Sequence, residues 1–170
     1  MISWLDAAFT EVGLFAVFAF LWFIGRFVLL GKKRILNFPT LSFFIAAISM
    51  CLVWGITGLV TDKARSEVSA YLDGLHGAEV IVDGRSLARP EAFLADLQKS
   101  WHIMSHHSHP TINLKVEVKS HRGSLRLILG RDSGNAEEYW VFYPGYSVTT
   151  KNEISRIRTI ELEQTSTSPR

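Results

Sequence analysis

The densest group of side chains able to do chemistry is a run of histidines, WHIMSHHSHP, over residues 101–110. It places His102, His106 and His109 within eight residues, with His107 between them. Two imidazoles at positions i and i+4 of a helix, with a third from the following loop, can bind zinc or copper. The run contains no cysteine or acid, and a helix C-terminus also favours histidine for electrostatic reasons. A structural role is therefore the preferred interpretation, and a metal site is the alternative.

A second candidate is an aromatic and basic set near the C-terminus. The segment YWVFYPGY, residues 139–146, would alternate its aromatic side chains between the two faces of a strand. One set would pack in the core, and the other could form an exposed aromatic surface of the kind enriched at binding sites. Two arginines flanking Ile157 could add a basic face for an anion. The candidate partner-binding residues are Trp140, Phe142, Tyr143, Arg156 and Arg158.

Acidic residues occur around the polar stretch GRDSGNAEE, residues 130–138. Paired carboxylates such as Asp132 and Glu138 can do acid–base work only in a cleft that faces a substrate. We expect instead a turn in which Asp132 and Ser133 bond their own backbone. Because no nucleophile, base and electrophile stand together, we expect no enzyme and no cofactor.

The helices and strands that must position these residues lie in two halves of the chain, which differ in their charge. Residues 1–61 carry six charged side chains, and residues 62–170 carry the other twenty-eight. Residues 39–61 form a charge-free run of twenty-three, which at about 1.5 Å per residue exceeds a hydrocarbon core of about 30 Å. Residues 12–30 are almost as apolar, apart from Arg26, whose side chain can reach the headgroups. We therefore predict a two-helix transmembrane hairpin over residues 1–61, with spans at 12–30 and 39–61 and a basic loop at 31–38.

The cations around that loop predict its orientation. Arg26, Lys32, Lys33 and Arg34 give four positive charges at the loop, against none before the first span and two, Lys63 and Arg65, just after the second. Such clusters favour the cytoplasmic side, so we expect both termini and the C-terminal domain to lie outside the cytoplasm of a bacterial inner membrane. A net charge of +2 gives no reason to expect nucleic acid, and the single Cys51 excludes an intrachain disulfide.

Residues 62–164 are predicted to form an α+β domain. Helical spacing after Thr61 should continue the second span outward, and a second helix should open at Pro90 with Phe93, Leu94, Leu97 and Trp101 on one face. Alternating apolar residues over 111–120 and 124–130 predict an antiparallel hairpin. Further strands are expected at 78–84, 139–146 and 157–163. Thr150 and Glu153 have the spacing of a capping box, which predicts a short helical turn there. The expected domain is a mostly antiparallel sheet of about four to five strands covered by two helices, with a disordered tail at 165–170.

These features favour a non-enzymatic membrane protein whose extracytoplasmic domain binds another envelope protein, as an accessory or immunity module. The alternative is a sensor that binds a ligand or metal at the histidine run or the basic sheet face and signals through the hairpin. The expected partners are the lipid bilayer and an envelope protein, with no nucleic acid. Small residues at positions 46, 47, 55 and 58 leave room for close contact between helices, so a homo-oligomer is a further alternative.

Overall fold

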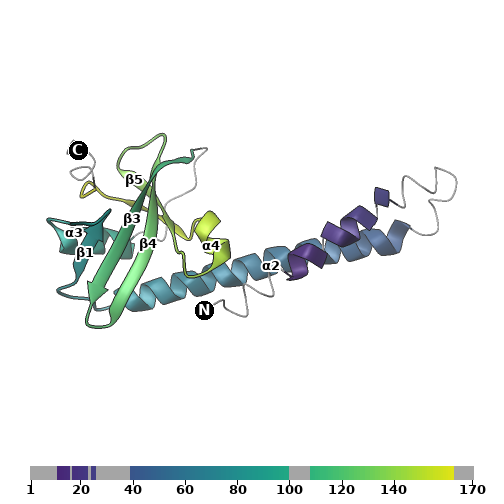
Figure 1. Cartoon of the computed structure of the whole chain (residues 1–170), viewed down its shortest axis with the longest axis horizontal. Helices are drawn as coiled ribbons and strands as arrows, with labels where there is room; N and C mark the ends of the chain where they lie inside the picture. Colours follow the sequence, from purple (N-terminus) through teal and green to yellow (C-terminus); the bar gives the residue numbers. More distant parts are fainter. Residues whose placement is uncertain (1–10, 16, 23, 26–38, 100–107, 163–170) are drawn as a thin grey trace. The chain divides into compact units, whose positions relative to one another are not determined.

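The computed structural model describes residues 11–15, 17–22, 24–25, 39–99 and 108–162 (Figure 1). The chain divides into two compact units, Met1–Val60 and Thr61–Arg170, each described here by itself. The predicted loop at 31–38 and the tail at 165–170 lie outside the described residues. The cations that predict the membrane orientation also lie outside the described residues: Arg26, Lys32, Lys33 and Arg34.

The longest element is the helix α2, which runs without a break from Pro39 to Leu72. Pro39 occupies the helix start, where a backbone N–H would have no partner within the helix. The helix does not end where the charge-free run ends at Thr61, so the predicted helical continuation is confirmed. Within α2, the segment Ala47–Leu72 is long and apolar enough to cross a membrane.

The predicted two-helix hairpin is corrected to one candidate span in the part of the chain that the structure describes. The other apolar helix described there, Glu11–Trp22, is shorter. The end of the predicted first span, residues 26–30, lies outside the described residues.

The second unit is an α+β domain built on a six-stranded antiparallel sheet, which confirms the predicted class of domain. The sheet has six strands instead of four or five, because two residues after the turn at Asp83 and Gly84 pair back onto Ile81 and Val82. A strand so short shows no alternation that a sequence could reveal. The strand order is β2-β1-β3-β4-β5-β6. The bounds are β1 Glu79–Val82, β2 Arg85–Ser86, β3 Pro110–Ser120, β4 Gly123–Asp132, β5 Glu138–Phe142 and β6 Ser155–Arg158, with helices α3 Pro90–Lys99 and α4 Ser147–Lys151.

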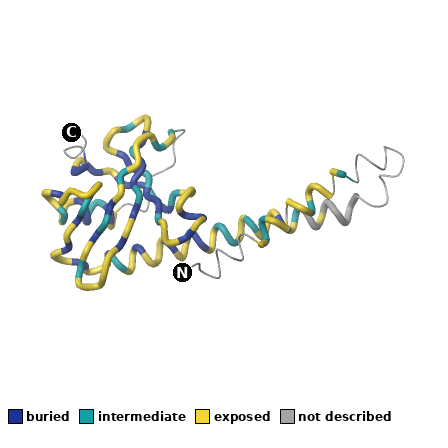
Figure 2. Tube along the Cα trace, viewed as in Figure 1, coloured by how far each residue is buried: buried dark blue, intermediate teal, exposed yellow. Residues whose placement is uncertain are grey.

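The register determines which side chains share a face of the sheet. Val80 pairs with Val118 and Val118 with Leu125, so these apolar residues lie on one face, the inner face. Buried and exposed residues alternate along β3 and β4, as Figure 2 shows. Buried residues of the two helices complete the core: Ala64, Val68 and Leu72 from α2, and Phe93, Leu94 and Leu97 from α3. The predicted face of α3 is thus confirmed for these three residues, and Trp101 lies outside the described residues.

The helical turn after β5 differs from the prediction. Helix α4 begins at Ser147, with Tyr146 as its N-cap residue, and not at Thr150. Thr150 lies inside the helix, where its hydroxyl donates to the carbonyl of Tyr146 at 3.0 Å. Glu153, the other half of the expected capping box, pairs with Arg156 at 3.0 Å instead. The capping-box spacing is therefore present, but its acid has a different partner.

Candidate functional sites

A row of directly paired residues crosses the outer face of the sheet, which is the face opposite the apolar inner face. Asn113, Gly130, Trp140 and Arg156 are successive partners on β3, β4, β5 and β6. The guanidinium carbon of Arg156 lies 3.7 Å from the centroid of the Trp140 ring, a cation–π contact. A Cβ on Gly130 would lie 2.6 Å from the Cβ of Pro110, so a side chain there would disrupt the close packing of the row. The row is therefore a tightly packed structural feature of this face.

Arg156 is held by two acids. Its side chain is only 4% exposed, and its Nε donates to Glu153 at 3.0 Å. Its Nη1 faces Glu138, whose side chain is 2% exposed, at 3.5 Å in an ion pair without hydrogen-bond geometry. Arg158 approaches the second oxygen of Glu138 at 3.8 Å. Two carboxylates thus balance two arginines, which offsets the cost of burying these charges and leaves little positive charge at Arg156 for an external anion.

Asp132 joins the end of β4 to its surroundings through four hydrogen bonds. One carboxylate oxygen accepts from the indole N–H of Trp140 at 2.7 Å and from the Ser108 hydroxyl. The other accepts from the backbone N–H groups of Gly134 at 2.7 Å and Asn135 at 3.0 Å, as the predicted turn requires. Burial raises the pKa of Asp132, but the four hydrogen bonds outweigh it and lower the pKa from 3.8 to about 2. The carboxylate is ionised at neutral pH and fully engaged, so it is poorly suited to act as a general acid or base.

The candidate partner-binding residues differ in their exposure. Phe142 and Arg156 are buried, and Trp140 and Tyr143 are half-buried. Arg158 has a side chain that is 58% exposed. Strands β4 and β5 separate β3 from β6, so the lysines of β3 do not neighbour these arginines. The accessible members of the predicted set are therefore Trp140, Tyr143 and Arg158.

Of the predicted metal ligands, the structure describes His109, whereas His102 and His106 lie outside the described residues. His109 is exposed, and its backbone exchanges hydrogen bonds with Ser133. Its Nδ1 lies 3.4 Å from the Ser133 hydroxyl. No group of three or more His, Cys, Asp or Glu side chains among the described residues could hold a metal ion. The metal site stays a prediction.

A polar and aromatic cluster that the sequence did not reveal joins α2 to the segment before α4. The Tyr146 hydroxyl donates to Glu67 at 2.6 Å, and the Tyr143 hydroxyl donates to the other oxygen of the same carboxylate at 3.4 Å. The Lys63 ammonium lies 5.7 Å from the centroid of the Tyr146 ring. Burial and then the Glu67 charge raise the pKa of Tyr143 above its usual 10.0. Sequence spacing could not reveal this cluster, because Glu67 and the tyrosines are more than seventy residues apart.

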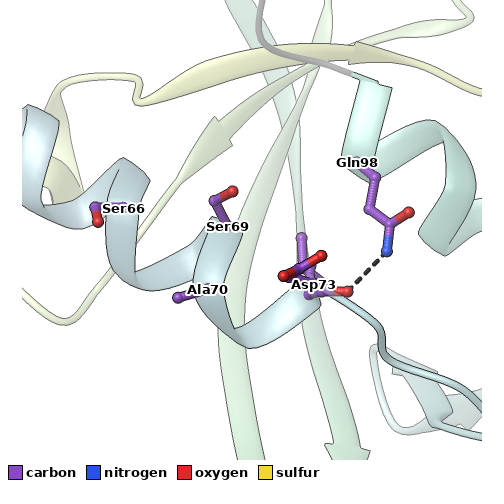
Figure 3. Close-up of a pocket in the computed structure, with 6 residues that line it drawn as sticks. Ser66, Ser69, Ala70, Asp73 and Gln98 are labelled. Atoms are coloured by element: carbon purple, nitrogen blue, oxygen red, sulfur yellow. Dashed lines mark hydrogen bonds between the residues drawn. The ribbon is translucent and has the colours of Figure 1, made fainter.

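A groove of about 430 Å³ lies beside the C-terminal end of α2. Figure 3 shows Gln98 of α3 reaching toward that end, where its amide donates to the carbonyl of Leu72 at 2.7 Å. The groove offers small polar side chains and one carboxylate, without a histidine or cysteine. It is lined by Ser66, Ser69, Ala70, Leu72, Asp73 and Gln98.

No family model, curated protein or solved structure matches this chain. The fold alone therefore defines the class of protein. This class has an α+β domain on a six-stranded antiparallel sheet. A long helix precedes the sheet and contains a segment apolar enough to span a membrane.

Proposed function

We propose that this chain is a membrane-anchored binding protein without catalytic activity, whose C-terminal domain docks another protein of the cell envelope. The observation that carries the proposal is the continuity of α2 from Pro39 to Leu72. Its first part belongs to the charge-free run, and Ala64, Val68 and Leu72 at its other end are buried in the core of the α+β domain. One helix therefore serves as both anchor and core element.

The surface of the first unit supports the anchor. Large apolar side chains there are exposed, among them Trp54 at 76%, together with Phe44, Ile48 and Leu59. Exposing apolar surface to water costs about 25 cal/mol per Å², and contact with lipid removes that cost. A run of such side chains on one helix is the surface expected of a membrane span.

The outer face of the sheet supports the binding role. The β3–β4 hairpin presents Lys115, Lys119 and Arg126 on this face, with Glu117 between them. Arg126 and Lys119 both pair with Glu117, at 3.3 Å and 3.7 Å. A charged face of mixed sign suits docking by electrostatic complementarity better than chemistry on a buried substrate. Trp140 and Arg158 are the residues of the predicted partner-binding set that are accessible on this face, and we assign the contact to them.

We also propose the finer topology, with the basic loop at 31–38 in the cytoplasm and the domain outside the inner membrane. A reporter fused to residue 165 tests it. We expect activity there from a reporter that works only outside the cytoplasm. Silence at residue 165, with activity there from a cytoplasmic reporter, would refute an extracytoplasmic domain.

The binding role is tested with a photo-crosslinking residue placed at Arg158 in the full chain within its native membrane. The matched control carries the same residue at Arg85, an exposed position on β2 at the opposite edge of the sheet. We expect a discrete protein adduct from position 158 that is absent from position 85 and is lost when Trp140→Ala is added. Equal adducts at both positions, or none at position 158, would contradict the assignment.

A further inference from the structure

We infer that residues Tyr143–Lys151, together with Lys63 of α2, form a lipid-contacting surface that binds anionic headgroups. This surface is named the headgroup face below. The inference rests on the proposed membrane anchor and adds a second contact with the membrane, made by the folded domain itself. Figure 1 shows α4 beside α2, and the contacts of Tyr146 with Lys63 and Glu67 join them.

The position of these contacts along α2 places the headgroup face close to the end of the apolar run. At about 1.5 Å per residue, Lys63 lies about 3 Å and Glu67 about 9 Å beyond Thr61. The polar layer on each side of a bilayer is about 5–8 Å thick. When the run ends at the hydrocarbon boundary, residues that touch α2 at position 63 therefore lie within the headgroup layer, and residues that touch it at position 67 lie at the outer edge of that layer.

The headgroup face is fixed to the domain. Thr149 is fully buried, and its hydroxyl donates to the carbonyl of Tyr143 at 2.6 Å. The backbone N–H of Tyr143 donates in return to the carbonyl of Thr149 at 3.1 Å. The Tyr143 ring lies over Gly145, where any Cβ would collide with it. The segment is therefore held in one conformation, so its orientation follows that of α2.

The side chains of the headgroup face match the chemistry of a membrane surface. Lys63 and Lys151 are exposed and carry positive charge, and Tyr143 is a half-buried aromatic with a polar hydroxyl. Tyrosine is enriched at the membrane interface, and each lysine near an anionic surface favours contact by about fivefold. The acids nearby are engaged: Asp62 pairs with Arg65 at 3.3 Å, and Glu67 accepts from both tyrosines.

The opposite end of the domain provides a natural contrast. At the β3–β4 turn, Arg122 donates to the carbonyl of Asp73 at 2.7 Å, just beyond the end of α2. Position 73 lies about 18 Å past Thr61 along the helix direction. The neighbouring His121 is exposed and should stand clear of the headgroup layer.

The test uses the full chain with Cys51→Ser in vesicles of phosphatidylcholine and phosphatidylglycerol. A fluorophore is attached through Pro144→Cys, and lipids with a quencher near the headgroup report contact. His121→Cys is the matched distant control, and Leu52→Cys with a mid-chain quencher reports the anchor. We expect quenching at positions 144 and 52 but not at 121. Replacing phosphatidylglycerol with phosphatidylcholine, or adding Lys63→Gln and Lys151→Gln, should reduce the quenching at position 144.

The outcomes separate this inference from the anchor. Quenching at position 52, with position 144 no more quenched than position 121, would overturn the headgroup face and leave the anchor standing. No quenching at position 52 would overturn both. Quenching at position 144 that is insensitive to the lysines and to phosphatidylglycerol would overturn the recognition of anionic lipid.

Discussion

Asp132 shows how much one side chain contributes to the order of this domain. Its carboxylate accepts hydrogen bonds from Trp140 of β5, from Ser108 before β3 and from the turn after β4. The residue is buried, so its carboxylate depends on these donors in place of water. One carboxylate thus holds three segments that are separate in the sequence.

Asp132→Asn should destabilise the domain by about 1–3 kcal/mol at pH 7, because the amide nitrogen cannot accept the bonds that the carboxylate oxygen accepts. The folded pKa of about 2 lies below the usual 3.8, so the ionised carboxylate stabilises the fold above about pH 4. That contribution is lost as the pH falls toward 2. Urea unfolding from pH 7 to pH 2 measures the free energy of unfolding of both proteins, and the difference between them should therefore shrink as the pH falls. The other acids titrate in both proteins and do not change this difference. A difference that stays constant would contradict the role given to Asp132.

At the scale of the element, α2 has two tasks in the proposed function. Its charge-free part would span the bilayer, and its last turns place Ala64, Val68 and Leu72 at four-residue spacing in the core. Residues on the opposite side of the same turns, such as Ala70, are exposed. The second task therefore depends on one face of the helix only.

Val68→Asp should destabilise the α+β domain by about 4 kcal/mol or more, because it buries an unpaired charge. Ala70→Asp, two residues away on the exposed side, should change stability by less than about 0.5 kcal/mol. Thermal unfolding followed by circular dichroism measures both. Membrane retention after an alkaline wash should be the same for the two variants, because the charge-free run is intact. Equal losses of stability would show that the face assignment is wrong.

At the scale of the whole molecule, the two compact units differ in the side chains that they expose. The first exposes large apolar side chains, and the second carries a buried core and a charged surface. Its inner sheet face, α3 and the end of α2 supply that core within residues 61–162. The domain should therefore not need the membrane in order to fold.

A fragment of residues 61–170 should be soluble without detergent and unfold cooperatively, whereas the full chain should need detergent or lipid. Heating monitored by circular dichroism, with sedimentation for solubility, measures this. The same fragment with Val68→Asp is the control and should lose the cooperative transition. An aggregated or unfolded wild-type fragment would mean that residues 1–60 are required for folding.

Local patterns were enough to predict several elements. The alternation over residues 111–120 determines β3, and the helical spacing of Phe93, Leu94 and Leu97 determines the buried face of α3. The continuation of α2 past Thr61 was also predicted, since the spacing of Val68 and Leu72 is helical. These features depend on side chains a few residues apart, so the period of the sequence determines them.

Only the tertiary structure decided how the charged and aromatic residues are used. Arg156 was expected on an anion-binding face, but Glu138 and Glu153 neutralise it. Glu67 acquires its role from tyrosines more than seventy residues away. The two-residue strand β2 was also beyond the pattern. The physical reason is that these contacts join segments far apart in the sequence. A buried charge is tolerated only where such segments supply its partners, and local spacing does not predict which segments will meet.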